Sequence, residues 1–418
     1  AGASPHSAVA VGGGAAGGQR GQAASVPAGV ATVTGPCRAE GWLAAPSWRA
    51  RRLEVSDLRP WRRLDVDLPA GLVVLVGPNG AGKTSVVEAL ALACIGVSPR
   101  TSREAEAIRR GAEALRVALE LQGPCGSHRR EIGYAPRLGR RLRLDGEPVR
   151  SLAAWRAPGA VLVFLPEELR AVKGPPAARR RHLDRLLEAA VDGYARDLAE
   201  YGAALTQRNA LLRRVRAGLT GAASLVPWES RMAVAGAAVA RARREAIARL
   251  APGFAAWLAA LGGGEGGYLR LEASPAGLDE VPGDRLEEAL AQALARGRDR
   301  DLQAAQTLAG PHRDDLWVGA GGADLRRTGS QGEQRTALLA LVLTHRDHLA
   351  RAAAAPILLL DDALSELDPG RRDRVLRAVA GEGQTIVTTA DPEAAHVAAS
   401  RGAAVLRVEN GRIAAEAP

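Results

Sequence analysis

One glycine-rich stretch has residue types and spacing suited to holding phosphate groups. Residues 77–84 read Gly-Pro-Asn-Gly-Ala-Gly-Lys-Thr and match the pattern G-x-x-x-x-G-K-[ST]. Glycines let the backbone turn its N–H groups inward, and a following helix start adds partial positive charge. In this pattern the lysine reaches the β- and γ-phosphates, and the Thr hydroxyl holds Mg²⁺. The sequence therefore predicts a site for ATP and Mg²⁺ formed by Gly77, Pro78, Asn79, Gly80, Ala81, Gly82, Lys83 and Thr84.

The flanking segments favour this site over an ordinary glycine-rich turn. The apolar run Leu72–Val76 predicts a buried parallel strand, and Thr84–Ile95 predicts a helix. A loop between strand and helix is the context that the phosphate-binding pattern requires. Basic residues are almost all arginine, with lysine only at positions 83 and 173. A lysine retained at position 83 indicates a place where a planar guanidinium does not fit.

Two adjacent carboxylates follow another apolar run near the C-terminus. Ile357–Leu360 predicts a core strand, and Asp361 and Asp362 come directly after it. Beside a phosphate loop, Asp361 suits Mg²⁺ coordination and Asp362 suits polarising the attacking water. Adjacent acids at a strand end are also common surface features. Ser365 and Asp368 favour the functional interpretation, because ABC-type ATPases carry a loop along the dimer seam at this place.

A third motif lies between these two, in Thr328–His345. Ser330 followed by Glu333 predicts a capping box, and the apolar positions Ala337–Val342 predict a helix that begins at Ser330. A structural cap would explain Ser330 alone. With Gln331 and Gly332, the helix start forms a second anion-binding end. With Gln331 and Gln334, the string resembles the ABC signature in its chromosome-maintenance form, which closes on the γ-phosphate of ATP held by a partner subunit. Two chains placed head to tail would then form two complete sites.

About 275 residues separate Lys83 from the aspartates, which is more than a compact nucleotide domain inserts between neighbouring strands. After Leu187, apolar positions step alternately by four and three, as in a heptad seam, with Arg208 as the single break. After a turn at Ala222–Pro227 the stepping resumes, which predicts an antiparallel helical hairpin. Helices of roughly 30 residues give an arm of about 45 Å. A helical bundle packed on the head is the alternative. The seam positions are Val191, Tyr194, Leu198, Tyr201, Leu205, Leu212, Val215 and Leu219, then Trp228, Met232, Ala235, Val239 and Ala242.

From about Arg51 to the end, the chain resembles the RecF family, whose members are related to the chromosome-maintenance (SMC) ATPases. Several strings occur in the expected order: GPNGAGKT, FLPEELRAVKGPPAARRRHLD, LTQRNALLR, GPHRDDL, GSQGEQRT and LLLDDALSELD. The resemblance implies an ATP-dependent DNA-binding protein, and we expect a slow, DNA-dependent ATPase that acts as a switch. It implies dimerisation on ATP, binding of double-stranded DNA at gaps or junctions, and help to RecO and RecR in placing RecA.

Other features of these strings keep two interpretations open. Lys173, Arg179, Arg180 and Arg181 form the densest positive cluster, which either contacts phosphate or starts a solvated helix. His312 in GPHRDDL is either a satisfied core histidine or a nucleotide contact by family likeness. Where many ABC proteins have a γ-phosphate-sensing His or a metal-linked Gln, this chain has Thr388-Thr389 with Asp391, and Pro166-Glu167-Glu168. These departures are compatible with slow hydrolysis.

Composition sets the class of protein and the expected division of the chain. The 418 residues carry a formal net charge of +10, which indicates a polyanionic partner such as nucleic acid. No apolar run approaches the roughly 18 residues of a membrane span, and three cysteines without metal-ligand spacing favour a reducing, cytoplasmic setting.

We expect an α/β ATPase head from residues 49–165 and 306–418, a helical arm at 166–305, and an extension without assigned function at 1–48. A transporter ATPase subunit would lack the arm, and a chromosome-tethering ATPase would need a longer one.

Overall fold

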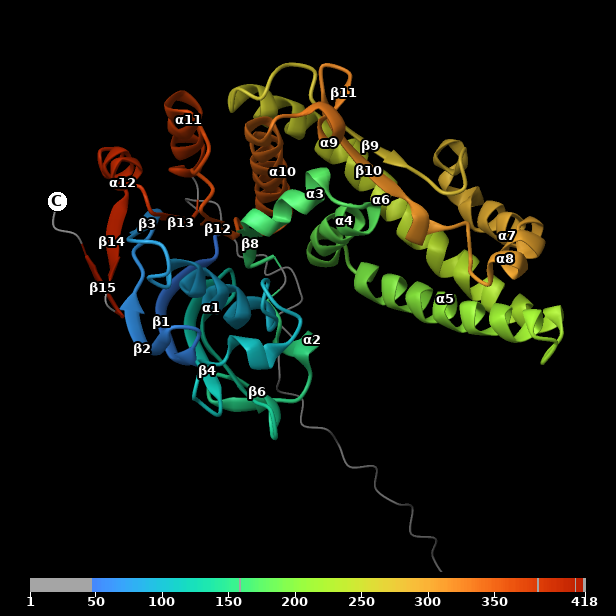
Figure 1. Cartoon of the computed structure of the whole chain (residues 1–418), viewed down its shortest axis with the longest axis horizontal. Helices are drawn as coiled ribbons and strands as arrows, with labels where there is room; N and C mark the ends of the chain where they lie inside the picture. The colour runs from blue at the N-terminus through green and yellow to red at the C-terminus, as the bar shows by residue number, and fades with distance from the viewer. Residues whose placement is uncertain (1–46, 158, 382, 410, 416–418) are drawn as a thin grey trace, which may run out of the picture. The chain divides into compact units, whose positions relative to one another are not determined.

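The computed structural model describes residues 47–157, 159–381, 383–409 and 411–415 (Figure 1). Of the extension at 1–48, only the last two residues lie within these ranges. The main-chain N–H of Trp48 donates to the carbonyl of Ala355 at 2.8 Å, and Ser47 forms an isolated parallel bridge with Ala355. None of the helices in these ranges has an apolar stretch long enough to cross a lipid bilayer.

A mainly parallel sheet carries the motifs found in the sequence. Its strand order is β15-β14-β3-β13-β12-β8, and only β15 is antiparallel to its neighbour. The register places Asp361 opposite Thr388, and Thr389 opposite Val76. The carboxyl ends of β3, β12 and β13 therefore meet at one edge. The strands are β3 (Leu72–Val76), β8 (Val161–Phe164), β12 (Ile357–Asp361), β13 (Thr385–Thr389), β14 (Ala404–Glu409) and β15 (Arg412–Ala415).

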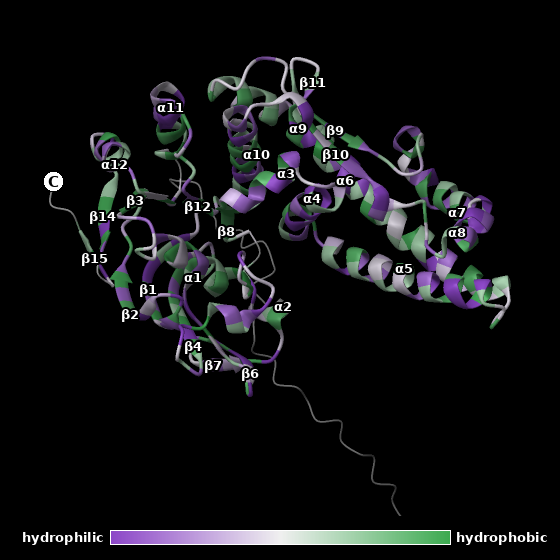
Figure 2. Cartoon of the chain, in the orientation of Figure 1, coloured by the Kyte–Doolittle hydropathy of each residue, from purple (hydrophilic) through white to green (hydrophobic). Residues whose placement is uncertain are grey.

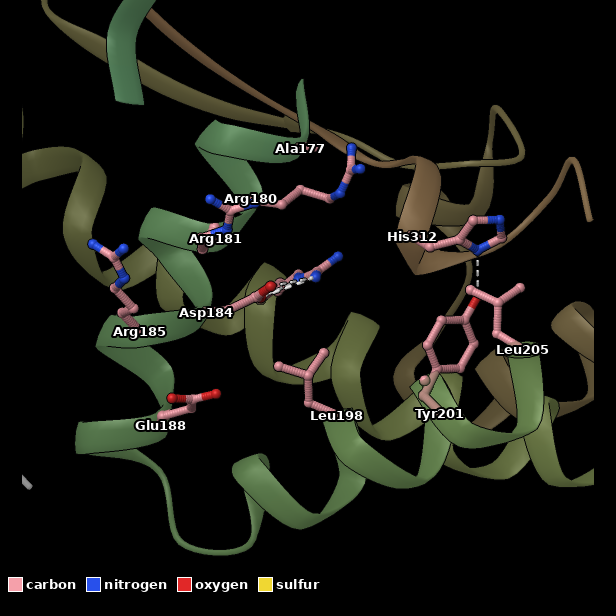
Figure 3. A pocket seen from close by; sticks show the side chains of 12 residues that line it. Ala177, Arg180, Arg181, Asp184, Arg185, Glu188, Leu198, Tyr201, Leu205 and His312 are labelled. Carbon is pink, nitrogen blue, oxygen red and sulfur yellow. Dashed lines mark hydrogen bonds and ion pairs between the residues drawn. The ribbon is translucent and has the colours of Figure 1, made fainter. Parts of the chain in front are cut away.

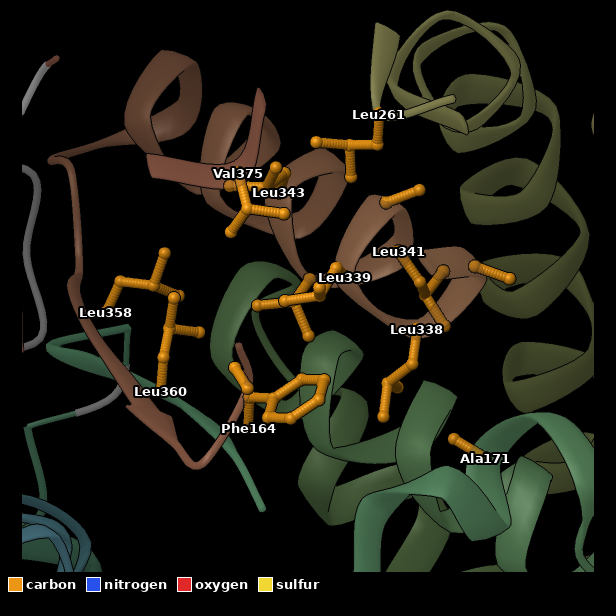
Figure 4. Packing of buried hydrophobic residues seen from close by; sticks show 14 of the residues in the cluster. Phe164, Ala171, Leu261, Leu338, Leu339, Leu341, Leu343, Leu358, Leu360 and Val375 are labelled. Atoms are coloured by element: carbon orange, nitrogen blue, oxygen red, sulfur yellow. The ribbon is translucent and has the colours of Figure 1, made fainter. Parts of the chain in front are cut away.

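Burial on both faces explains the continuous apolar runs of these strands. All five residues of β3 are buried, and they alternate between two hydrophobic clusters on opposite faces of the sheet. Helix α10 (Gln331–Ala352) covers one face, where Leu338 and Leu339 lie near Phe164 of β8 and Leu360 of β12 (Figure 4). The same cluster includes residues of α3 (Arg170–Lys173), α11 (Pro369–Val379) and α12 (Pro392–Ala399).

Helix α1 (Lys83–Ile95) covers the other face and is buried between the parallel sheet and an antiparallel one. Most of its residues are buried, and most of the buried ones are apolar (Figure 2), as expected for a helix enclosed in this way. The antiparallel sheet has the order β2-β1-β4-β5-β6-β7. Its strands are β1 (Arg49–Leu58), β2 (Trp61–Asp67), β4 (Leu115–Gly123), β5 (Gly126–Ala135), β6 (Gly139–Leu144) and β7 (Glu147–Val149), followed by helix α2 (Leu152–Trp155).

Helices dominate the segment between β8 and the signature motif, together with a three-stranded sheet of order β11-β10-β9 that the sequence did not predict. The helices are α4 (Pro176–Ala190), α5 (Tyr194–Arg216), α6 (Val226–Ala260), α7 (Leu286–Arg296), α8 (Arg298–Ala304) and α9 (Leu325–Thr328). The strands are β9 (Tyr268–Glu272), β10 (Asp315–Ala320) and β11 (Ala323–Asp324). Short 3₁₀ helices are η1 (Glu104–Ala107), η2 (Pro166–Leu169), η3 (Ala222–Leu225), η4 (Leu278–Glu280), η5 (Gly283–Arg285) and η6 (Pro311–Arg313).

The predicted antiparallel hairpin is formed by α5 and α6, but its boundaries differ from the prediction. The seam predicted from Leu187 is interrupted, because α4 ends at Ala190 and Gly193 adopts a left-handed φ of 82° before α5. The turn is shorter than predicted, since Pro227 already lies in the first turn of α6. A proline is tolerated there because the first helical N–H groups have no partner within the helix.

Helix α6 also packs on the head, as the alternative prediction of a helical bundle requires. Its N-terminal half pairs with α5, whereas Leu250, Phe254 and Leu258 share a hydrophobic cluster with α10. Arg208, the break in the seam, is fully buried and forms ion pairs with Glu229 of α6 at 3.0 Å and Asp301 of α8 at 2.7 Å. The break is thus a polar contact that joins three helices.

Candidate functional site

The phosphate-loop pattern forms a turn between β3 and α1, and its glycines meet separate steric demands. Gly80 and Gly82 have left-handed φ values of 82° and 104°, a conformation that a side chain disfavours. A Cβ on Gly77 would lie 2.1 Å from the carbonyl oxygen of Val408, and one on Gly82 would lie 2.8 Å from Nε1 of Trp61. The backbone can follow this path only without side chains at these positions.

Lys83 lies at the start of α1 and points back into the loop. Its Nζ donates to the carbonyl oxygens of Gly77 at 2.7 Å and Pro78 at 2.9 Å. Burial lowers the pKa of the Lys83 ammonium, while Asp361 and Asp362 act in the opposite direction. An ammonium surrounded by loop backbone, next to exposed Pro78, Asn79 and Gly80, fits a group that carries several negative charges.

The parallel sheet brings Asp361 to Thr84. The Thr84 hydroxyl donates to Oδ1 of Asp361 at 3.0 Å, and the Thr388 hydroxyl donates to the same oxygen at 2.7 Å. Burial raises the pKa of the Asp361 carboxyl, and these two hydrogen bonds partly offset that effect. A buried carboxylate beside a hydroxyl is a donor set that suits Mg²⁺.

Asp362 begins a turn, with a left-handed φ of 51°. Its main-chain N–H donates to the Thr388 hydroxyl at 3.0 Å, and its Oδ2 accepts from the Ser365 hydroxyl at 2.9 Å. Thr388 therefore holds both members of the acidic pair, one through its proton and one through its oxygen.

Arg335 is a residue at this edge to which the sequence analysis assigned no role. It comes from α10, and its Nη1 donates to the carbonyl oxygens of Asp362 at 3.0 Å and Ser365 at 2.6 Å, as well as to the Ser365 hydroxyl. The side chain is almost fully buried. It joins the signature helix to the turn that positions Asp362. The only sequence signal was its place in the quoted motif GSQGEQRT.

The capping box predicted for the signature motif is present. The Ser330 Oγ accepts from the main-chain N–H of Glu333 at 3.3 Å, and the Glu333 carboxylate accepts from the main-chain N–H of Ser330 at 2.8 Å. Ser330 and Gln331 are exposed, and Gly332 is half-buried. Gln334 instead turns inward and donates to the carbonyl oxygens of Leu325 and Gly329.

The structure thus brings together part of the predicted site. Residues 77–84, Asp361 and Asp362 converge at one sheet edge through the contacts above. Among the described residues, no hydrogen bond joins Ser330, Gln331 or Gly332 to residues 77–84.

The two segments that depart from the ABC pattern have structural partners. Asp391 caps α12 and pairs with Arg372 at 2.7 Å, and its main-chain N–H donates to the Thr389 hydroxyl at 3.0 Å. Glu168, just beyond β8, lies 2.6 Å from Arg185 and 3.4 Å from His182. Burial disfavours the ionised Glu168 carboxyl, but His182 and Arg185 hold its pKa at about 2. The segment after β8 is therefore tied to α4.

The basic cluster divides between structural and outward-facing residues. Arg179 is buried and pairs with Asp315 through both carboxylate oxygens. Lys173 and Arg181 are exposed, and Arg180 is half-buried. Arg179 is therefore neither placed for contact with phosphate nor part of a solvated helix start, which were the two interpretations of the cluster.

GPHRDDL forms a structural junction. His312 is hydrogen-bonded at both ring nitrogens, to the Tyr201 hydroxyl at 2.7 Å and the Thr307 carbonyl at 3.1 Å, and burial lowers its pKa to about 4. Asp314 accepts from Arg243 at 3.0 Å and from the main-chain N–H of Ser274 at 2.9 Å, and burial raises its pKa to about 6. Both ring nitrogens of His312 are thus satisfied, as the first of the two interpretations predicts, and the side chain is half-buried.

Comparison with known proteins agrees with this geometry. A family model described as an AAA domain matches residues 52–132. In structure, the chain is similar to an SMC head domain from Pyrococcus furiosus, with a TM-score of 0.53 and 16% identity over 88% of this chain and 96% of that one. Fold and motifs together define a P-loop ATPase head of the ABC and SMC class.

Relatives narrow the class to one family. "DNA replication and repair protein RecF" of Heliobacterium modesticaldum is 33% identical over 86% of this chain and 97% of its own length. The protein of the same name from Frankia alni is 36% identical over 81% and 92%. The recombination mediator RecF with ATP has a TM-score of 0.78 at 24% identity, over 90% of this chain and 99% of that one. The chain belongs to the RecF family, and the predicted resemblance and fold class are confirmed.

Proposed function

We propose that the protein is an ATPase that binds DNA in recombinational repair and replication restart, and that ATP closes two copies of it into a dimer. Three observations support this proposal: membership of the RecF family, the convergence of loop and carboxylates at one sheet edge, and the exposed N-terminus of the signature helix. The head would comprise residues 49–165 and 306–418 and the arm residues 166–305. Since chromosomal DNA would be its substrate, it would act in the cytoplasm.

Each site residue has a proposed role. The backbone of residues 77–82 and the Lys83 ammonium would hold the β- and γ-phosphates of ATP. Thr84 and Asp361, already joined by a hydrogen bond, would hold Mg²⁺, which supplies charge neutralisation at the phosphates when bound. Asp362, fixed by Thr388 and Ser365, would orient and polarise the attacking water.

The observation that carries the dimer is that, within the described residues, no hydrogen bond joins the two phosphate-binding elements of one chain. Ser330 and Gln331 face solvent, and within the described residues the side-chain hydrogen bonds of Ser330 go to Glu333 alone. A helix N-terminus with exposed polar groups is suited to contact an anion. A second copy placed head to tail would bring Ser330, Gln331 and Gly332 to the triphosphate held by residues 77–84.

DNA would be held mainly by phosphate contacts without base readout. The net charge of +10 favours a polyanion, and such binding weakens steeply as salt rises. By family membership, the protein would bind double-stranded and gapped DNA and would work with RecO and RecR to load RecA. ATP hydrolysis would be slow and would reopen the dimer, so the enzyme would act as a switch.

One variant tests this proposal directly. Asp362→Asn should retain ATP binding and lose hydrolysis, so light scattering should show a stable dimer with ATP, and that dimer should bind gapped DNA. Lys83→Ala is the matched control and should stay monomeric, because it lacks the ammonium that holds the phosphates. A monomeric Asp362→Asn protein in saturating ATP would refute the switch. Filter binding to gapped and blunt DNA, with and without ATP, separates this function from that of a transporter subunit.

A further inference from the structure

A cavity of about 380 Å³ lies between α4 and α5, away from the phosphate loop (Figure 3). Helix α4 contributes one wall with charged side chains, and α5 contributes Leu198, Gly202 and Leu205. Arg243 of α6 and His312 of η6 complete the lining. None of the residues assigned above to ATP or Mg²⁺ takes part. A cavity of this volume is large enough for a small organic ligand.

The charged wall has more positive than negative groups. Arg180, Arg181, Arg185 and Arg243 face the cavity together with Asp184 and Glu188. Arg243 is ion-paired with Asp184 and Asp314, and Arg185 with Glu168. The charges of Arg243 and Arg185 are therefore balanced within the protein. Of the charged lining groups, Arg180, Arg181 and Glu188 remain, and burial raises the pKa of the Glu188 carboxyl, which favours its neutral form.

Arg180 is half-buried and is held by a neutral group. Its Nη1 donates to the main-chain carbonyl of Asp314, and among the described residues no carboxylate lies within ion-pair distance of it. Burial and the nearby Arg243 lower the pKa of Arg180, and Asp314, Asp184 and Asp315 act in the opposite direction from beyond ion-pair distance. A half-buried cation without a direct counter-ion is costly, and an anion in the cavity would stabilise it.

Arg181 is exposed at the same wall and has no hydrogen bond or ion pair within the described part of the chain. It differs in this respect from Arg179, whose guanidinium is fully used by Asp315. Arg180 and Arg181 both line the cavity, and each guanidinium can donate N–H groups to a phosphate there.

The remaining walls are uncharged. Leu198, Leu205 and Gly202 form an apolar surface on α5, and the hydrogen-bonded pair of Tyr201 and His312 stands beside it (Figure 3). With both ring nitrogens occupied, His312 contributes no charge near neutral pH. The cavity thus combines a cationic wall with an apolar floor.

We propose that this cavity binds one nucleotide unit, with its phosphate against Arg180 and Arg181 and its sugar or base over Leu198 and Leu205. The volume accepts a single nucleotide and excludes a base pair, so the unit comes from an unpaired strand. A free nucleotide presents the same chemistry. The choice of a DNA strand as the source rests on the proposed function.

Two variants of the full-length protein test the site in different ways. Arg181→Gln removes one exposed cation. Gly202→Leu fills the cavity and leaves every charge in place, since a Cβ at Gly202 has no other atom within 4 Å. Replacement of a helical glycine by leucine also favours the helix, so this variant should not melt at a lower temperature. Arg249→Gln, at an exposed arginine of α6 outside the cavity, is the control.

Binding is measured with the phosphate loop saturated by a non-hydrolysable ATP analogue, so that the probes cannot occupy it. The probes are a fluorescent oligo(dT) of about 12 nucleotides, within the range of known single-strand sites, and thymidine 5′-monophosphate. Anisotropy should show that Arg181→Gln weakens oligonucleotide binding roughly tenfold, as expected for one charged hydrogen bond, and lowers the salt slope by about 0.7. Gly202→Leu should weaken binding at least as much, and Arg249→Gln should match the wild type.

Each outcome of these binding measurements either identifies the ligand of the cavity or overturns the proposal. If only the oligonucleotide binds and Gly202→Leu weakens it, a strand is the ligand. If thymidine 5′-monophosphate also binds and depends on Gly202 and Arg181, the cavity accepts free nucleotides. Wild-type affinity in Gly202→Leu, or no binding of either probe, overturns the proposal. ATP-dependent light scattering of the same variants reports on the dimer independently, so failure of the cavity and failure of the proposed function can be told apart.

Discussion

Thr388 shows how one hydroxyl group can position two catalytic candidates. It donates to Asp361 and accepts from the N–H of Asp362, so the two carboxylates keep a fixed relation to each other. The sequence analysis noted Thr388 only as a departure from the ABC pattern. Its role depends on the register between β12 and β13, which pairs Asp361 with Thr388. Motif spacing along the chain does not contain this information.

At the same scale, Gly77 should be intolerant of even the smallest side chain. Gly77→Ala would place a methyl group against the carbonyl oxygen of Val408, so the loop or β14 must shift. We expect a loss of about 1–3 kcal/mol in unfolding free energy and a strongly reduced affinity for ATP. Urea unfolding and ATP titration check this. Gly221→Ala, where the added methyl meets nothing within 4 Å, should behave as wild type, and equal behaviour of the two variants would contradict the prediction.

Arg335 should affect catalysis more than nucleotide binding. It holds the turn that contains Asp362 and makes no hydrogen bond with residues 77–84 among the described residues. Arg335→Met should lower kcat for ATP hydrolysis roughly tenfold or more, as does loss of other groups that orient catalytic residues, while the Kd for ATP stays nearly unchanged.

Steady-state kinetics and ATP titration separate these two effects. Arg327→Gln, at an exposed arginine just before the signature motif, is the control. A parallel rise in Kd would argue against a positioning role for Arg335.

The helices and strands with a strong local sequence signal lie where they were predicted, whereas some of the boundaries between them do not. β3 was predicted to the residue, and the capping box located the start of α10, because buried runs and caps are local properties. The break at residues 191–193 was missed, since a seam of apolar residues crosses it without a change of period. The small sheet β11-β10-β9 was also missed, because β9 and β10 come together only in the folded chain.

The hairpin should depend on the buried Arg208 more than on any exposed arginine. Arg208→Met would leave Glu229 and Asp301 buried without this partner. Breaking a buried ion pair typically costs about 3–5 kcal/mol of unfolding free energy. The Asp301 carboxylate is less accessible to water than that of Glu229. Chemical unfolding followed by circular dichroism measures the loss. Arg249→Met, at an exposed pair on α6, should change stability by less than about 1 kcal/mol. Similar values for both variants would show that the buried contacts matter little.

At the scale of the whole molecule, the proposed dimer predicts that two inactive variants regain ATPase activity when they are mixed. A Lys83→Ala chain has an intact signature helix, and a Ser330→Arg chain has an intact phosphate loop. Each protein alone should be inactive. A mixture should regain about a quarter of the wild-type ATPase rate per chain, because half of the dimers are mixed and each holds one complete site. A coupled ATPase assay during titration of one variant into the other measures this, and no recovery would argue against sharing of sites.

Helix α6 has a mechanical property that follows from its two sets of contacts. Pro252 and Gly253 lie within the continuous helix where it crosses Thr344 of α10, and a Cβ on Gly253 would lie only 3.2 Å from the Thr344 methyl group. Proline removes one hydrogen bond of the helix and glycine adds flexibility, so α6 is least stiff beside the signature helix. The segment of α6 between Val226 and Pro252 is about 40 Å long at 1.5 Å per residue. A tilt of a few degrees at the crossing would therefore move the N-terminal end of α6, at Val226, by several ångströms.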